Sequence, residues 1–119
     1  MKIREIVKLL DAKLMTGEEY LDSEVSSACC SDMMSDVLAY VKDQGVLITG
    51  LINPQVIRTA NMMDMICIVI VRGKTPTDEM VKLAEECGIT LMCSDKRAFE
   101  ASGILYAGGL SRSLEGKNA

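Results

Sequence analysis

The sequence predicts an α/β domain with three layers (α/β/α), in which helices cover both faces of a mostly parallel, mixed sheet of about five strands. The first observation is an unbroken apolar stretch at residues 65–71, Met-Ile-Cys-Ile-Val-Ile-Val. Because it does not alternate with polar residues and is too short to cross a membrane, it is typical of a strand buried on both faces within a parallel sheet. The second observation is that strand and helix patterns alternate from residue 46 onward, which favours βαβ units with parallel neighbours.

Two helical patterns and two short extended segments precede this alternating region. Apolar residues spaced i, i+3, i+4, i+7 predict an amphipathic helix from residue 2 to about residue 11. Extended segments are expected at residues 12–15 and 24–30, and at least one of them can pair antiparallel with the sheet. The next helix is predicted to begin at Ser31, whose hydroxyl is a good N-cap, and to end at Gln44-Gly45.

Local start and stop signals place the remaining elements. Strands are expected at residues 46–49, 65–71 and 89–93. Asn53-Pro54 predicts the start of a helix, because Asn is a good N-cap and Pro suits the first helical position. Further helices are expected at residues 78–87 and 95–106, and the last of these is predicted to direct Ala98, Phe99, Ser102 and Leu105 inward. Residues 1–110 are therefore predicted to form one domain, followed by a flexible tail at 111–119.

Composition restricts the classes of function. The formal charge is -4 and the pI about 4.8, which disfavours binding to nucleic acid and to anionic membranes. The chain has no apolar signal segment, so we expect a cytoplasmic protein. It has no histidine, and its five cysteines form no Cys-x-x-Cys motif. These features disfavour a zinc site, a disulfide framework and a histidine-activated nucleophile, and we expect neither a metal nor a cofactor.

Candidate ligand-binding residues follow the predicted parallel strands. In open α/β sheets, ligands bind outside the carboxyl ends of the strands, where helix N-termini favour anions. The candidates at these ends are Asn53, Arg72, Gly73, Lys74, Ser94 and Lys96. This pattern is compatible with a small phosphorylated or nucleotide ligand, but ordinary helix caps and solvated loop charges are the preferred explanation of these residues. Neither a Gly-x-Gly-x-x-Gly sequence nor a P-loop supports a specific nucleotide site.

Asp32 and Asp36 are spaced i, i+4 in the predicted helix that begins at Ser31. Paired carboxylates can perform acid–base chemistry, so an accessory enzyme for phosphotransfer or hydrolysis is an alternative function. Acidic residues also favour a first helical turn for electrostatic reasons alone, and we prefer that interpretation. Doubled methionines at 33–34 and 62–63 cannot all face one core, which predicts an exposed apolar patch suited to self-association.

One segment carries a family resemblance. Residues 31–39, Ser-Asp-Met-Met-Ser-Asp-Val-Leu-Ala, resemble the Ser-Asp-Leu-Leu-Ser-Asp-Val-Met-Ala segment of the DRTGG domain. Residues 1–7, 14–18, 61–64 and 98–106 fit this family as well, so that the resemblance covers about residues 2–110. The matching motif residues are Asp22, Ser31, Asp32, Ser35 and Asp36. In the namesake Asp-Arg-Thr-Gly-Gly region the chain retains Asp22, but it lacks the arginine and the glycine pair.

The resemblance implies a function that composition and spacing do not show. The DRTGG domain is an α/β module related to the N-terminal domain of HPr kinase/phosphorylase, and it also occurs in phosphotransacetylases and in CBS-domain pyrophosphatases. This chain is similar to the stand-alone form found in anaerobic bacteria. No catalytic residues are assigned to the module. The resemblance therefore implies a non-enzymatic regulatory or ligand-sensing domain that acts as a homodimer beside a partner enzyme.

Overall fold

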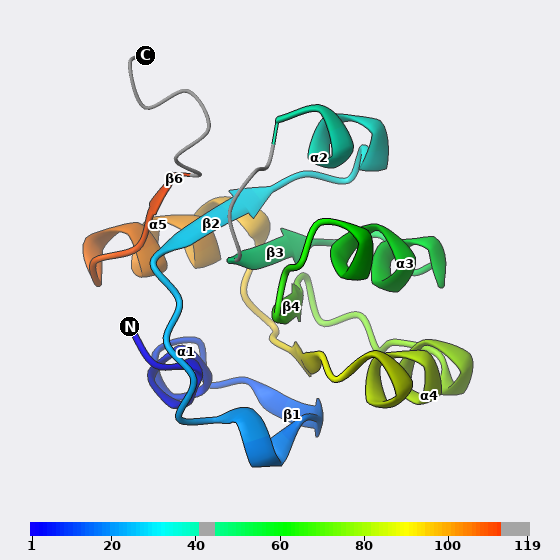
Figure 1. Cartoon of the computed structure of the whole chain (residues 1–119). Helices are drawn as coiled ribbons and strands as arrows, with labels where there is room; N and C mark the ends of the chain where they lie inside the picture. The colour runs from blue at the N-terminus through cyan, green and yellow to red at the C-terminus, as the bar shows by residue number, and fades with distance from the viewer. Residues whose placement is uncertain (41–44, 113–119) are drawn as a thin grey trace.

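The computed structural model describes residues 1–40 and 45–112, and it confirms the predicted three-layer architecture (Figure 1). One face of the sheet is covered by α1 (Ile3–Leu9) and α5 (Ala98–Ala107). The opposite face is covered by α2 (Met34–Tyr40), α3 (Gln55–Met62) and α4 (Asp78–Cys87). Within the described ranges, no helix combines the length and the apolar character that a membrane span requires.

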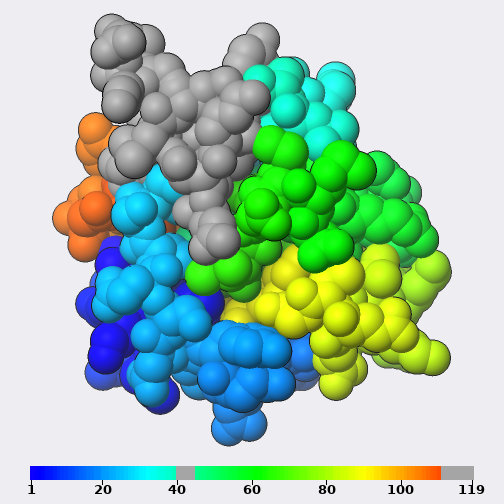
Figure 2. Space-filling view, viewed as in Figure 1, coloured from blue at the N-terminus to red at the C-terminus, as the bar shows by residue number. Residues whose placement is uncertain are grey.

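The sheet is mixed and mostly parallel, as predicted. Its strands are β1 (Lys13–Thr16), β2 (Ser27–Cys30), β3 (Val46–Thr49), β4 (Cys67–Ile70), β5 (Thr90–Cys93) and β6 (Ser111–Arg112), and a 3-10 turn, η1 (Glu18–Tyr20), follows β1. The spatial order is β1-β5-β4-β3-β2-β6, and only β1 pairs antiparallel with its neighbour. Figure 2 shows the segment around β1 lying directly against α4, which closes that side of the domain.

The apolar stretch at 65–71 forms the interior strand β4, which pairs with β3 on one side and β5 on the other. All four strand residues are fully buried. Cys67 and Val69 pack toward the core beneath α1 and α5, whereas Ile68 and Ile70 pack toward α2, α3 and α4. A strand with two dry faces must carry apolar side chains at every position, which explains the absence of alternation.

The C-terminal boundary differs from the prediction. Ser111 and Arg112, which the sequence pattern assigns to a tail, form β6 and pair with Ser27 and Ala28 of β2. The pairing satisfies backbone groups that an edge strand would otherwise leave open. The rest of the predicted tail, residues 113–119, lies outside the described residues. Residues 41–44, which were predicted to complete the helix that begins near Ser31, lie outside them as well.

The predicted inward face of the last helix is partly wrong. α5 begins at Ala98 and buries Ala101 and Leu105, but Phe99 is 92% exposed. The helix is apolar around almost its whole circumference, so periodicity could not distinguish its inner face from its outer face.

The interior position of β4 leads to a stability prediction. Replacing Ile68 with Ala should lower the free energy of unfolding by about 2–5 kcal/mol, because it leaves a cavity between β4 and the helices that cover it. Denaturant unfolding measures this change. The matched control is Met62→Ala at the end of α3, where the side chain is 68% exposed, and it should change stability by no more than about 0.5 kcal/mol. Equal costs for the two variants would contradict the assignment of β4 to the interior.

Candidate functional site

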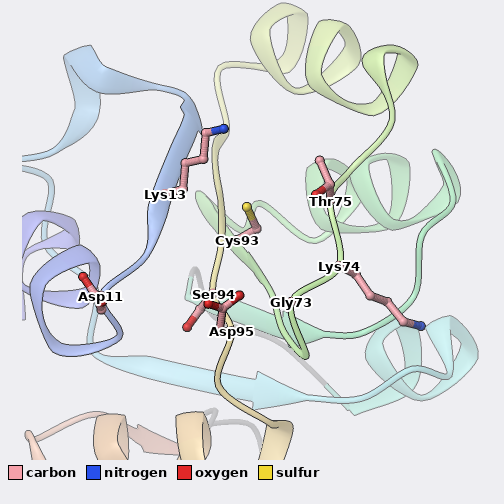
Figure 3. A pocket seen from close by; sticks show the side chains of 8 residues that line it. All are labelled: Asp11, Lys13, Gly73, Lys74, Thr75, Cys93, Ser94 and Asp95. Atoms are coloured by element: carbon pink, nitrogen blue, oxygen red, sulfur yellow. The ribbon is translucent and has the colours of Figure 1, made fainter.

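A cavity of about 260 Å³ opens at the carboxyl ends of β4 and β5, beside the start of the antiparallel strand β1 (Figure 3). Its lining residues are Asp11, Lys13, Gly73, Lys74, Thr75, Cys93, Ser94 and Asp95. Three predicted candidates, Gly73, Lys74 and Ser94, are therefore brought together. They lie together because β4 and β5 are parallel neighbours whose carboxyl ends meet at one edge of the sheet.

Hydrogen bonds join the loops that form the cavity wall. The buried hydroxyl of Ser94 donates to the carbonyl oxygen of Leu10 at 2.8 Å and accepts from the Lys96 N–H at 3.2 Å. The Gly73 N–H donates to the Ser94 carbonyl at 3.0 Å, and the Arg72 N–H donates to the Lys96 carbonyl at 2.8 Å. Arg72 and Gly73 both have φ at +69°, so the chain turns sharply as it leaves β4. The loops after β4 and β5 thus form one connected wall.

The cavity carries charges of both signs. Asp11 and Asp95 contribute carboxylates, and Lys13 and Lys74 contribute ammonium-bearing side chains. Figure 3 shows the Lys74 side chain extending away from Ser94 and Asp95. Its Nζ donates to the carbonyl oxygen of Gly50 at 2.9 Å, a neutral acceptor at the end of β3. Lys74 therefore connects the cavity loop to the neighbouring strand end.

The thiol of Cys93 also lines the cavity and lies 3.8 Å from the sulfur of Met15. Burial raises the pKa of this thiol above its usual value. The protonated form is a poor nucleophile. Cys93 therefore contributes a protonated thiol to the wall of the cavity.

Asp32 makes a second arrangement at the end of β3, which we term the Asp32 clamp. Its Oδ1 accepts from the Thr49 hydroxyl at 2.9 Å and from the Gly50 N–H at 2.8 Å, and its Oδ2 accepts from Nη2 of Arg72 at 3.3 Å. The Gly50 N–H is the main reason why the pKa of Asp32 lies below its usual value, with smaller contributions from Thr49, Arg72 and Lys74. The clamp ties the segment after β2 to the ends of β3 and β4.

The clamp overturns both sequence-based interpretations of Asp32. α2 begins at Met34, so Asp32 precedes the helix and forms no i, i+4 pair with Asp36 on a helix face. Ser31 is not the N-cap, because its Oγ accepts from the Met33 N–H at 2.9 Å in a turn before the helix. The carboxylate of Asp32 instead binds donors of β3 and β4, which short-range spacing could not reveal.

The other predicted residues lie outside the cavity. Asn53 Oδ1 accepts from the Gln55 N–H at 2.8 Å in the turn before α3. However, α3 begins at Gln55 with Pro54 as its N-cap, so the helix starts one residue later than predicted from Asn53 as N-cap. Arg72 directs its guanidinium to Asp32, and a Cβ on Gly50 would overlap with that guanidinium. Asp22 accepts from Nε of Arg4 at 3.1 Å on the surface, and this hydrogen bond lowers its pKa. Lys96 contributes backbone groups to the wall, and Ser35 is exposed on α2.

Sequence reasoning missed the lining residues Asp11, Lys13, Thr75, Cys93 and Asp95. Thr75, Cys93 and Asp95 adjoin residues that it did select. Asp11 and Lys13 flank the start of β1, and no local signal shows that β1 pairs with β5.

A second hollow of about 290 Å³ beside β1 contains Glu18, Glu19 and Glu85, which disfavour an anionic ligand there. Among the described residues, no group of three or more His, Cys, Asp or Glu side chains could hold a metal ion.

The Asp32 clamp leads to a prediction with a defined pH dependence. Asp32→Asn should lower stability by about 1 kcal/mol at pH 7, because it weakens charge-assisted hydrogen bonds of a side chain that is 54% exposed. The folded-state pKa lies below the model-peptide value of 3.8, so the stabilisation is complete above that pH and is lost as the pH falls through the lower folded-state value. Denaturant unfolding at several pH values between 7 and 3 measures the difference.

The control for this prediction is Asp36→Asn, which alters an exposed residue in the first turn of α2 and should cost no more than a few tenths of a kcal/mol. A loss of stability in Asp32→Asn that stayed constant down to pH 3 would contradict the role of the ionised carboxylate.

Comparisons with known proteins agree with this architecture. A family model described as the DRTGG domain matches residues 5–107. The structure is similar to the CBS and DRTGG domains of the regulatory region of Clostridium perfringens pyrophosphatase, complexed with the activator diadenosine tetraphosphate. The TM-score is 0.76 at 17% sequence identity, and the match covers 96% of this chain and 49% of that one. No curated protein matches the chain. Because the family model spans most of the sequence, the chain belongs to the DRTGG domain family.

Proposed function

We propose that this chain is a non-enzymatic regulatory domain that senses a small phosphorylated ligand and acts as a homodimer beside a partner enzyme. The observation that carries the proposal is the cavity of about 260 Å³ at the carboxyl ends of β4 and β5. Open α/β sheets bind ligands at this edge. Membership of the DRTGG family and the likeness to a regulatory region that is complexed with a nucleotide activator support a regulatory role.

The size and charge of the cavity narrow the class of ligand. Pockets for drug-sized molecules have roughly 300–1,000 Å³, so this cavity suits a compact phosphate ester better than a dinucleotide. Asp11 and Asp95 would repel a bare phosphate but can accept hydrogen bonds from hydroxyl or amino groups. Lys13 and Lys74 supply positive charge. We therefore favour a ligand that carries a phosphate together with hydroxyl groups, such as a phosphorylated sugar or polyol.

Lys74 offers a way for the domain to respond to such a ligand. In the structure its ammonium group donates to the neutral carbonyl of Gly50. A phosphate is a stronger acceptor, because charge-assisted hydrogen bonds are roughly twice as strong as neutral ones. Rotation of Lys74 toward the ligand would release the end of β3 next to the Asp32 clamp. Binding would then alter the segment between β3 and α3, which a partner enzyme can recognise.

The alternative of an accessory enzyme that uses Asp32 and Asp36 has less support. Asp32 is bonded to Thr49, Gly50 and Arg72, and these contacts account for its position without a substrate. The two carboxylates also belong to different local structures, because Asp32 precedes α2 and Asp36 lies in its first turn. We therefore assign Asp32 a structural role.

The proposal predicts a change in thermal stability on ligand binding. We expect glycerol 3-phosphate or ribose 5-phosphate to raise the melting temperature more than inorganic phosphate, because only the esters supply donors to Asp11 and Asp95. At 100 times the dissociation constant, a ligand adds about 2.7 kcal/mol, which corresponds to several degrees for a domain of this size. Calorimetric titration of the best compound gives the affinity directly.

Variants locate the binding site. Lys74→Ala and Lys13→Ala should each weaken binding at least tenfold, because each removes a cation from the cavity wall. Each thermal shift is compared with the same variant without ligand, since Lys74→Ala also removes the hydrogen bond to Gly50. Lys82→Ala on the exposed side of α4 is the matched control and should bind normally. The proposal fails if no phosphate ester binds, or if binding is equally strong in all three variants.

A further inference from the structure

The outer face of α5 carries exposed aromatic side chains that no described part of the chain covers. Phe99 is 92% exposed and Tyr106 is 74% exposed. Both are located on the side opposite the buried residues Ala101 and Leu105. Glu100 is the one charged residue within the helix. A helix that is apolar on all sides is typically buried, so the exposed face of α5 indicates a contact surface.

Gly103 lies between the two aromatic residues on this surface. It follows Phe99 by four positions and precedes Tyr106 by three, so all three share one helix face. A Cβ added to Gly103 would have no heavy atom within 4 Å beyond its immediate helical surroundings. The face therefore has a shallow centre between two rings, and another helix can approach closely there.

We propose that this surface, formed by Phe99, Gly103 and Tyr106, is where two copies of the chain meet as an antiparallel α5–α5 pair. This proposal rests on the homodimer in the proposed function and specifies its interface. A twofold dimer requires a patch that is complementary to itself. When two α5 helices cross at Gly103 in opposite directions, Phe99 of each copy lies opposite Tyr106 of the other. The near-equal spacing of the rings about Gly103 thus satisfies the twofold requirement.

Charge favours the same orientation. Arg97 is exposed at the N-terminal end of α5. In an antiparallel pair it lies near the C-terminal end of the partner's α5, where the helix dipole is negative and attracts cations. A parallel arrangement would place the two Arg97 side chains near each other. Electrostatics therefore select the antiparallel pair.

The available area is compatible with a stable dimer. Phe and Tyr bury roughly 150–250 Å² each, so four rings contribute on the order of 600–1,000 Å². Together these side chains approach the roughly 1,200 Å² at which specific interfaces begin.

The predicted methionine patch is a weaker candidate for this role. Met33 and Met62 are exposed, at 61% and 68%, as the sequence pattern implies. However, α2 and α3 follow two parallel strands and run in the same direction, while Met33 precedes α2 and Met62 ends α3. The two side chains therefore belong to opposite ends of this helix layer and form no continuous surface.

Sedimentation equilibrium of the full chain tests the interface. The unmodified protein should sediment at about twice its 13.0 kDa chain mass. Phe99→Glu should weaken dimerisation at least tenfold by placing a charge at the contact. Gly103→Leu should do the same by filling the shallow centre, and its open surroundings mean that the monomer should fold normally. Met62→Glu, an equally drastic change on a different exposed surface, should leave the dimer intact.

The outcomes separate this inference from the proposed function. Monomers for Phe99→Glu and Gly103→Leu, with a dimer for Met62→Glu, support the α5 interface. If the unmodified chain is a dimer and both α5 variants remain dimers, the interface is elsewhere and only this inference fails. If the unmodified chain is monomeric at all concentrations, both the inference and the homodimer in the proposed function fail. Ligand binding is measured independently of both.

Discussion

The rest of the structure depends on the complete burial of β4. Its backbone pairs with parallel strands on both sides, and its side chains alternate between two apolar cores. Neither face can be left to solvent, so the chain must place helices on both sides of the sheet. Each connection between parallel strands must then cross over through a helix, and the carboxyl ends of β2, β3, β4 and β5 meet at one edge. The burial of one strand thereby determines where polar loops can gather.

The loops at this edge differ in how far their charged side chains are neutralised by contacts within the chain. At the end of β3, Asp32 accepts hydrogen bonds from Thr49, Gly50 and Arg72, so the chain supplies its own anion where a ligand could otherwise bind. At the ends of β4 and β5, the same edge retains a cavity with charged side chains on its wall. Lys74 connects the two regions through Gly50. One end of the edge is thus closed by the fold itself, while the other is open to a small molecule.

Sequence patterns predicted the fold more completely than the site. The layers and the parallel strands followed from β4 and from the alternation after residue 46, because burial on two faces leaves a clear apolar signature. Gly73, Lys74 and Ser94 were predicted as candidates because they follow parallel strands, and all three line the cavity. Asp11 and Lys13 were not predicted, because they reach the cavity only through the antiparallel pairing of β1 with β5. The contacts of Asp32 span 17, 18 and 40 residues, and local spacing contains no information about them.

The proposed ligand site and the proposed dimer surface are adjacent in the chain. Ser94 and Asp95 line the cavity, and α5 begins at Ala98 and presents Phe99. The connecting segment 95–97 is tied to the loop after β4, because the Lys96 carbonyl accepts from the Arg72 N–H. A ligand that shifts this segment would also shift the N-terminal end of α5. Coupling between two sites is reciprocal, so a ligand that favours the dimer must bind more tightly to the dimer than to the monomer. The short path between the cavity and α5 gives such coupling a physical basis in one rigid helix.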